Sequence, residues 1–110
     1  MFLNEEEARE LTCILDSISE VYDGYAREAA DSGDRAFAFD SEQSVKAIRR
    51  VVREIRNGEF DDCHRAFLYR ELYSYARECT RLLRQPENVS EVLRDRKALA
   101  EYWCNRVAER

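Results

Sequence analysis

The sequence predicts an all-α protein, folded as a compact antiparallel bundle of about four helices in a single domain over residues 1–110. Apolar residues recur at the helical period along nearly the whole chain. Only 3 glycines and 1 proline interrupt that pattern. A chain of 110 residues is also too short for two independent cores. Short connections between amphipathic helices favour antiparallel packing.

The first helix is expected from Asn4, a good N-cap residue, to about Asp31, with Gly33 behind it. Three glutamates in its first turn suit the positive end of the helix dipole. One broad stripe carries its apolar residues and continues through Gly24. The opposite side carries an acidic stripe: Asp16, Glu20 and Asp23.

Residues 32–40 are expected to form a loop that contains two aromatic residues, Phe37 and Phe39. Aromatic side chains are unusual in a solvated loop. We expect them to close one end of the core. The alternative is that they contact a partner.

The second helix is expected to begin at Asp40, because Gln43 three residues later completes a capping-box pattern. It should end at Asn57-Gly58. One face is apolar, and the opposite face carries a row of bases at positions i, i+3, i+4, i+7 and i+10: Lys46, Arg49, Arg50, Arg53 and Arg56.

The third helix should begin after Asp61 or Asp62 and run to about Arg84, with Phe67 well away from its apolar stripe. It is apolar over much of its circumference, which suggests a central position or a second buried contact. The fourth helix should begin after Asn88, where Glu91 completes another capping-box pattern. Its stripe contains Arg96, for which an internal ion pair is expected, and these apolar residues: Val89, Val92, Leu93, Leu99, Ala100, Trp103 and Val107.

Composition excludes several classes of site. Three glycines exclude a glycine-rich phosphate loop, and one histidine excludes a multi-histidine metal site. The four cysteines are widely spaced and contain no Cys-x-x-Cys pair, so we expect no zinc, no other cofactor and reduced thiols. No apolar stretch is long enough for a membrane helix, and no signal-peptide pattern is present, so a cytoplasmic location is expected.

Two carboxylate clusters, Glu6-Glu7-Ala8-Arg9-Glu10 and Glu28-Ala29-Ala30-Asp31, are similar as a string to the Glu-Glu-x-x-Glu…Glu-x-x-Asp pattern of MazG-like nucleotide pyrophosphohydrolases. The resemblance implies a helical, magnesium-dependent hydrolase in which Glu7, Glu10, Glu28 and Asp31 converge on the metal. On one continuous helix the clusters are 21 residues, or about 31 Å, apart. This alternative therefore requires the first helix to fold back near Gly24.

The net charge of −5 combines a strongly acidic segment, residues 1–42, with a basic remainder. Such a chain can attract charged partners or pair its own acidic helix with its own basic one. We expect a small acidic protein without catalytic activity that binds a protein partner, with a homodimer as one option. Size and charge are similar to those of phage or mobile-element inhibitors, including anti-CRISPR proteins, and of toxin-immunity proteins.

The residues expected to bind the partner are the acidic stripe, the two loop phenylalanines, Phe67 and four arginines of the basic row: Arg49, Arg50, Arg53 and Arg56. In this hypothesis the acidic stripe imitates phosphates and occupies a cationic groove. Nucleic-acid binding by the basic row is a further alternative that is not favoured, because no aromatic residue is expected within the row and the protein is acidic.

Overall fold

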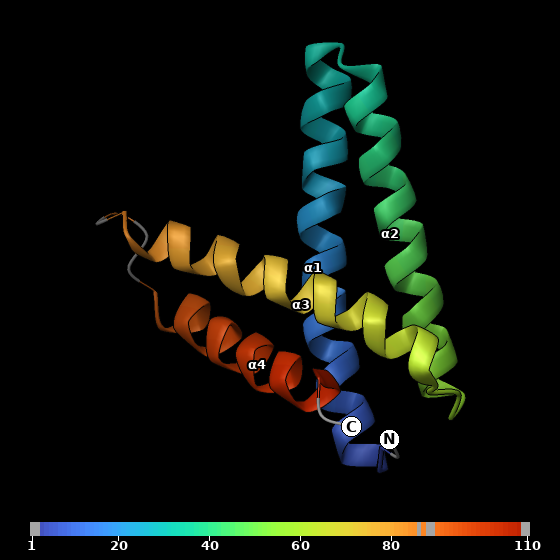
Figure 1. Cartoon of the computed structure of the whole chain (residues 1–110). Helices are drawn as coiled ribbons and strands as arrows, with labels where there is room; N and C mark the ends of the chain where they lie inside the picture. Colours follow the sequence, from blue (N-terminus) through green and yellow to red (C-terminus); the bar gives the residue numbers. More distant parts are fainter. Residues whose placement is uncertain (1–2, 86, 88–89, 109–110) are drawn as a thin grey trace. The chain divides into compact units, whose positions relative to one another are not determined.

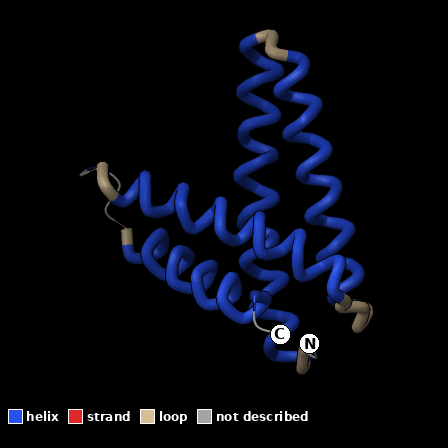
Figure 2. The backbone as a smooth tube through the Cα atoms, in the orientation of Figure 1, coloured by secondary structure: helices blue, strands red, loops and turns tan. Residues whose placement is uncertain are grey.

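The computed structural model describes residues 3–85, 87 and 90–108. It contains four helices: α1 (Glu5–Ser32), α2 (Arg35–Arg56), α3 (Asp62–Leu83) and α4 (Glu91–Ala108) (Figure 1). The described part of the chain has no strand (Figure 2), so the predicted all-α class with four helices is confirmed. Two compact units are present: a hairpin of α1 and α2 within Leu3–Glu59, and a hairpin of α3 and α4 in the chain from Phe60 onward.

Helix α1 has the predicted N-terminus. The Asn4 side chain accepts a hydrogen bond from the Glu7 backbone N–H at 2.8 Å, and the Glu7 carboxylate accepts one from the Asn4 backbone N–H at 3.2 Å. This capping box satisfies two donors that would otherwise lack partners at the helix start. The helix runs without interruption through Gly24 and ends at Gly33, whose φ of 84° suits glycine. The predicted continuous helix is therefore confirmed.

Helix α2 begins five residues earlier than predicted, so the expected loop over residues 32–40 is wrong. The Asp34 side chain accepts a hydrogen bond from the Phe37 backbone N–H at 3.1 Å and caps the helix. Ala38 and Ser41 are buried and extend the apolar face by two turns. Small side chains give a weak periodic signal, and this is why the sequence favoured the later capping box at Asp40. The helix ends before Asn57-Gly58 as predicted.

The expectation that Phe37 and Phe39 close the core is also wrong. Their side chains are 49% and 60% exposed. Both lie in the first turns of α2, which follow directly on the turn that connects α1 to α2 (Figure 1).

Helix α3 is capped by Asp61, whose carboxylate accepts hydrogen bonds from the backbone N–H groups of Cys63 and His64. Its buried side includes Leu68, Leu72 and Cys79, which are at most 1% exposed. The helix ends at Leu83, one residue before the predicted end.

Helix α4 begins at Glu91, where the Ser90 hydroxyl accepts a hydrogen bond from the Leu93 backbone N–H at 3.4 Å. The predicted cap Asn88 and the predicted core residue Val89 lie outside the described residues. Ala100, Trp103 and Val107 are buried as predicted, Leu93 and Leu99 are half-buried, and the prediction for Val92 is wrong, because it is 58% exposed.

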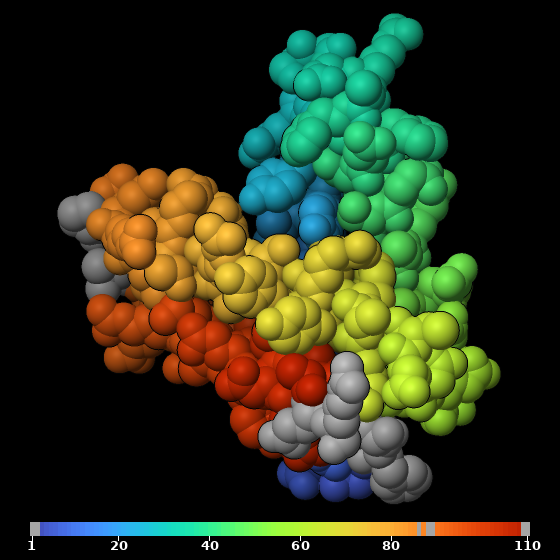
Figure 3. Space-filling model, viewed as in Figure 1, coloured from blue at the N-terminus to red at the C-terminus, as the bar shows by residue number. Residues whose placement is uncertain are grey.

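The side chains of α3 and α4 pack against one another along the hairpin (Figure 3). The Arg65 Nε donates a hydrogen bond to the Val107 carbonyl oxygen at 3.1 Å, which adds a polar contact near the open end of this hairpin. None of the helices in the described ranges combines the length and the apolar composition needed to cross a bilayer.

Candidate binding surfaces

The two carboxylate clusters of α1 do not come together. Glu7 and Glu10 lie in the first two turns of an uninterrupted helix, and Glu28 and Asp31 lie in its last two. About 31 Å of helix separates the clusters, whereas carboxylates that share a metal ion must lie within a few ångströms of it. Among the described residues, no group of three or more acidic, histidine or cysteine side chains is arranged to hold a metal. The geometry gives no support to the MazG-like alternative.

The segment Asp61-Asp62-Cys63-His64 contains metal-capable residue types, but its side chains cap α3. The His64 Nδ1 accepts a hydrogen bond from the Asp61 backbone N–H at 3.1 Å, and the ring stacks near Phe60 with centroids 6.1 Å apart. The nitrogen that accepts this hydrogen bond has its lone pair occupied and does not bind a metal at the same time. Asp61 and His64 therefore have a structural role as the cap of α3.

All four thiols are free. Cys13 and Cys63 are exposed, whereas Cys79 and Cys104 are buried, and burial raises the pKa of both buried thiols. A raised pKa keeps a thiol protonated and weakly nucleophilic. The buried pair therefore lacks the character of catalytic cysteines.

Arg96 is exposed, so the expected internal ion pair with a carboxylate is wrong. Its charge instead acts on two buried groups of α3, Tyr75 and Cys79. Burial raises the pKa of Tyr75, the nearby Cys79 raises it further, and Arg96 opposes both effects. The long arginine side chain reaches from solvent over an apolar surface, which avoids the cost of burying a charge.

The acidic stripe of α1 is partly occupied by the protein's own arginines. Asp16 Oδ2 lies 3.1 Å from Arg56 Nη2 of α2, and Asp23 Oδ2 lies 2.8 Å from Arg27 Nη2 one turn away. Glu20 is exposed and forms no ion pair with a described residue. Of the three carboxylates in the acidic stripe, Asp16 and Asp23 are each paired with an arginine of this protein. Among the described residues Glu20 has no such partner, so its carboxylate is the one left to imitate a phosphate.

The basic face of α2 is formed by the predicted row, and all five side chains are exposed: Lys46, Arg49, Arg50, Arg53 and Arg56. Arg56 pairs with Asp16, and Arg50 Nε lies 3.3 Å from Glu54 Oε1. Lys46, Arg49 and Arg53 form no ion pair with any described residue. From Gln43 to Arg56 every exposed charged residue is a cation.

Phe39 lies on the same side of α2 as this basic face. It precedes Lys46 by seven residues and Arg53 by fourteen, spacings that return to one side of an α-helix. Phe37 lies nearly half a turn away, and its ring centroid is 6.3 Å from that of Tyr25 in α1. Correcting the helix boundary therefore places an exposed aromatic ring at one end of the row of cations.

The prediction for Phe67 is answered only in part. Phe67 is half-buried, and the Arg70 guanidinium lies over its ring at 5.7 Å. Sequence reasoning missed two neighbours, Tyr69 and Tyr73, which are 44% and 48% exposed. Their i, i+4 spacing is visible in the sequence and could have indicated that they share one side of the helix.

Comparisons of the chain with models of protein families, with curated proteins and with solved structures give no match.

Proposed function

We propose that this protein is a binding protein without catalytic activity, which docks on an acidic surface of a protein partner through the basic face of α2 and Phe39. One observation carries the proposal. Lys46, Arg49 and Arg53 form no ion pair with the described residues, and they share a side of the helix with the most exposed phenylalanine of the described chain.

The residue types fit a protein interface. Arginine and aromatic residues are enriched among the side chains that contribute most to protein–protein affinity. Arginine also forms planar, two-pronged contacts with carboxylates. From Phe39 to Arg53 the surface extends about 21 Å along the helix, which matches an acidic helix or strand on the partner that also offers one apolar contact.

We expect this protein to act as a small inhibitor or immunity protein, and its partner to be the protein that it inhibits or neutralises. Proteins of this kind act by covering a surface of another protein, and they need no catalytic site.

The test compares two charge-matched double variants. Arg49→Glu with Arg53→Glu removes the central cations of the basic face. Arg9→Glu with Arg94→Glu changes the net charge equally at exposed positions of α1 and α4. Tagged proteins capture partners from nuclease-treated extract of the source organism, and mass spectrometry identifies them. A captured protein is then purified, and its affinity for each variant is measured by calorimetry.

We expect the first double variant to lose at least about tenfold in affinity, and Phe39→Ala to lose a similar amount, because both remove interface anchors. The control variant should retain wild-type affinity. Equal losses in both double variants would reject a specific interface on α2. If Glu20→Lys alone abolishes binding, the interface lies on the acidic stripe of α1 instead.

Nucleic-acid binding is a second candidate, because Phe39 supplies an aromatic ring at the end of the basic face. It predicts that the captured material disappears on nuclease treatment. It also predicts an affinity for oligonucleotides that falls steeply with salt and depends on Arg49 and Arg53.

A further inference from the structure

The solvent-exposed side of α3 differs in charge from the protein as a whole. Between residues 66 and 84 its exposed charged residues are all arginines, although the whole chain has a net charge of −5. Of the two carboxylates in this stretch, Glu71 is buried, and Glu78, whose side chain is 32% exposed, is paired with Arg81. We name this surface the tyrosine–arginine face. Its exposed residues are Ala66, Tyr69, Arg70, Tyr73, Ser74, Arg77, Arg81 and Arg84.

Two tyrosines and one arginine of this face form a continuous stack. The rings of Tyr69 and Tyr73 have centroids 6.1 Å apart and planes inclined by only 14°. The Arg77 guanidinium lies over the other end of the stack, 5.8 Å from the Tyr73 ring centroid. Spacings of four residues place the three side chains on successive turns of the helix. Because both rings are nearly half exposed, the stack is accessible from solvent.

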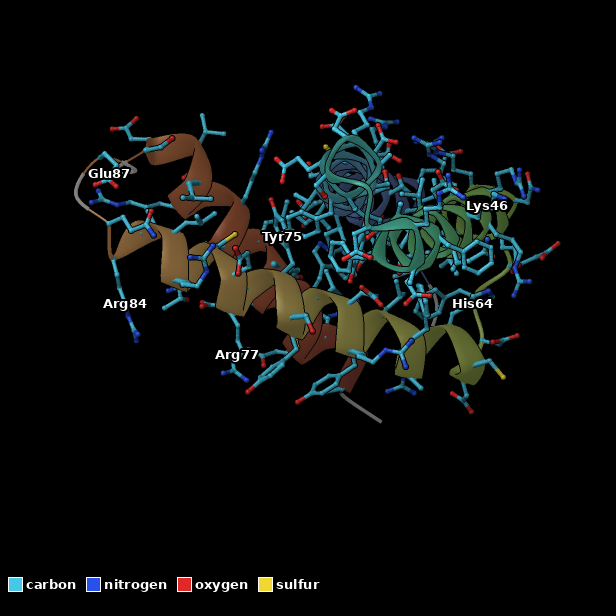
Figure 4. All side chains as sticks on the ribbon, turned by 90° about the horizontal axis from the view of Figure 1, so that it is seen from above. Lys46, His64, Tyr75, Arg77, Arg84 and Glu87 are labelled. Atoms are coloured by element: carbon cyan, nitrogen blue, oxygen red, sulfur yellow. The ribbon has the colours of Figure 1, made fainter. Side chains whose placement is uncertain are left out.

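The cations of this face differ in how far they are already neutralised. The Arg81 Nε donates a hydrogen bond to Glu78 Oε2 at 3.0 Å, and this contact lowers the pKa of the Glu78 carboxyl. By contrast, Arg77 and Arg84 form no ion pair with a described residue. They project from the same side of α3, opposite Tyr75 (Figure 4).

Two open depressions border the stack. One is lined by residues of α3 and α4 that include Arg65, Tyr69 and Val107, together with Asp62, whose carboxylate is paired with Arg65. The other runs along α3 beside Ser74, Arg77 and Arg84, and also includes Glu78, whose carboxylate is paired with Arg81. The surface thus provides room for a chain that follows α3 past the tyrosines toward the unpaired arginines.

We propose that the tyrosine–arginine face binds single-stranded nucleic acid, with bases on the tyrosine stack and the phosphate backbone on Arg77 and Arg84. Stacking on aromatic rings combined with a cationic track is how proteins bind single strands without reading their sequence. An acidic peptide would use the arginines but would gain little from two parallel rings. A duplex would keep its bases in its own stack, out of reach of the tyrosines.

This proposal is independent of the protein-binding role assigned to α2, because it concerns a different helix in the other unit. The two proposals can fail separately. The controls for the tyrosine–arginine face are therefore taken from positions outside both proposed surfaces.

The experiment measures fluorescence anisotropy of labelled single-stranded oligo(dT) and oligo(U) with the full-length protein over a range of salt concentrations. Two double variants of the tyrosines form a matched pair. One combines Tyr69→Leu and Tyr73→Leu, and the other combines Tyr69→Phe and Tyr73→Phe. The leucines remove the ring faces, whereas the phenylalanines keep them. Arg77→Glu with Arg84→Glu removes the unpaired cations, and Arg9→Glu with Arg94→Glu is the charge-matched control at exposed positions of α1 and α4.

We expect wild-type binding that weakens as salt increases. The leucine pair should lose at least about tenfold in affinity, and the phenylalanine pair should stay within about twofold of wild type, because each base stacked on an aromatic ring contributes substantially. The Arg77 and Arg84 pair should weaken binding and reduce its dependence on salt. The Arg9 and Arg94 control should bind as the wild type does.

Three results would overturn the proposal. One is no binding to either oligonucleotide at low salt. Another is equal weakening by the Arg9 and Arg94 control and by the Arg77 and Arg84 pair. The third is full displacement of the oligonucleotide by an equimolar acidic peptide such as oligo-glutamate, which would assign the face to an acidic protein instead. Helical circular dichroism checks the folding of every variant. Should the leucine pair unfold, the arginine pair and the phenylalanine pair still decide the outcome.

Discussion

The Arg56 guanidinium of α2 lies 3.1 Å from the Asp16 carboxylate of α1. This contact joins the basic face of one helix to the acidic stripe of the other. The sequence had left open whether these opposite charges attract an external partner or each other. In the structure one pair of opposite charges is internal, because Arg56 and Asp16 neutralise one another. Arg49 and Arg53 form no ion pair with a described residue, so their charges face solvent.

The Arg56–Asp16 pair should contribute little to stability, because both side chains are about half exposed, at 58% and 47%. Exposed ion pairs contribute about 0.2–1 kcal/mol. A double-mutant cycle with Arg56→Ala and Asp16→Ala, followed by urea unfolding, should give a coupling energy in that range that decreases with added salt. A coupling energy above about 2 kcal/mol would show that the pair is more strongly coupled than its exposure indicates.

Gly24 within α1 and Gly33 at its C-cap should respond in opposite ways to alanine. A Cβ atom at Gly24 meets nothing within 4 Å, and this residue lies inside the helix, so Gly24→Ala should stabilise the protein by about 0.5–1 kcal/mol. Gly33 has a φ of 84°, where a side chain is strained, so Gly33→Ala should destabilise it by about 1 kcal/mol. Thermal unfolding of both variants checks the signs. Stabilisation by Gly33→Ala would contradict the left-handed cap.

Trp103 should be the most costly side chain of α4 to truncate. Its side chain has no exposed surface, and Trp103→Ala should lower the free energy of unfolding by about 3–5 kcal/mol. The adjacent Tyr102 is 48% exposed and serves as the control, since Tyr102→Ala should cost less than about 1 kcal/mol. Urea unfolding measures both. A similar loss in the two variants would mean that Trp103 is less well packed than its burial indicates.

Features encoded by a few neighbouring residues were predictable from the sequence. The Asn4 cap, a cap at Asp61 or Asp62 and the Asn57-Gly58 terminus were all predicted, because a cap depends on side chains within three or four residues of the helix end. The reciprocal hydrogen bond to Glu7 was not predicted. The continuity of α1 through Gly24 was predictable for a related reason. One glycine inside a helix destabilises it less than the packing of a long apolar stripe stabilises it.

Features that depend on what covers a side chain were not predictable. Val92 and Leu99 share the periodicity of Trp103 and yet are 58% exposed and half-buried, because periodicity gives a direction around a helix and not the length over which a neighbour covers it. The exposure of Tyr69 and Tyr73 was not predictable for the same reason. The late predicted start of α2 hid Phe39 from the basic face, so this candidate site became visible only with the correct helix boundary.

The stability of the protein should decrease above about pH 9. Burial raises the pKa values of Tyr75, Cys79 and Cys104 in the folded state. As the pH rises past the ordinary values of these groups, about 8.5 for a thiol and about 10 for a tyrosine, the unfolded chain loses protons first. The unfolded state then binds fewer protons than the folded state, so the free energy of unfolding falls with pH. Below that range all three groups are protonated in both states, and they contribute no pH dependence.

Urea unfolding at a series of pH values from neutral to about pH 10.5 measures this loss. Tyr75→Phe and Cys79→Ala remove two of the titrating groups and should each flatten the alkaline part of the profile, whatever their effect at neutral pH. Cys13→Ala is the control, because that thiol is exposed and should leave the slope unchanged. A wild-type profile that stays level through the alkaline range, or one that Cys13→Ala flattens as much as Cys79→Ala does, would contradict the assignment. The buried hydroxyl and thiol on α3 would then not be the groups whose ionisation opposes folding.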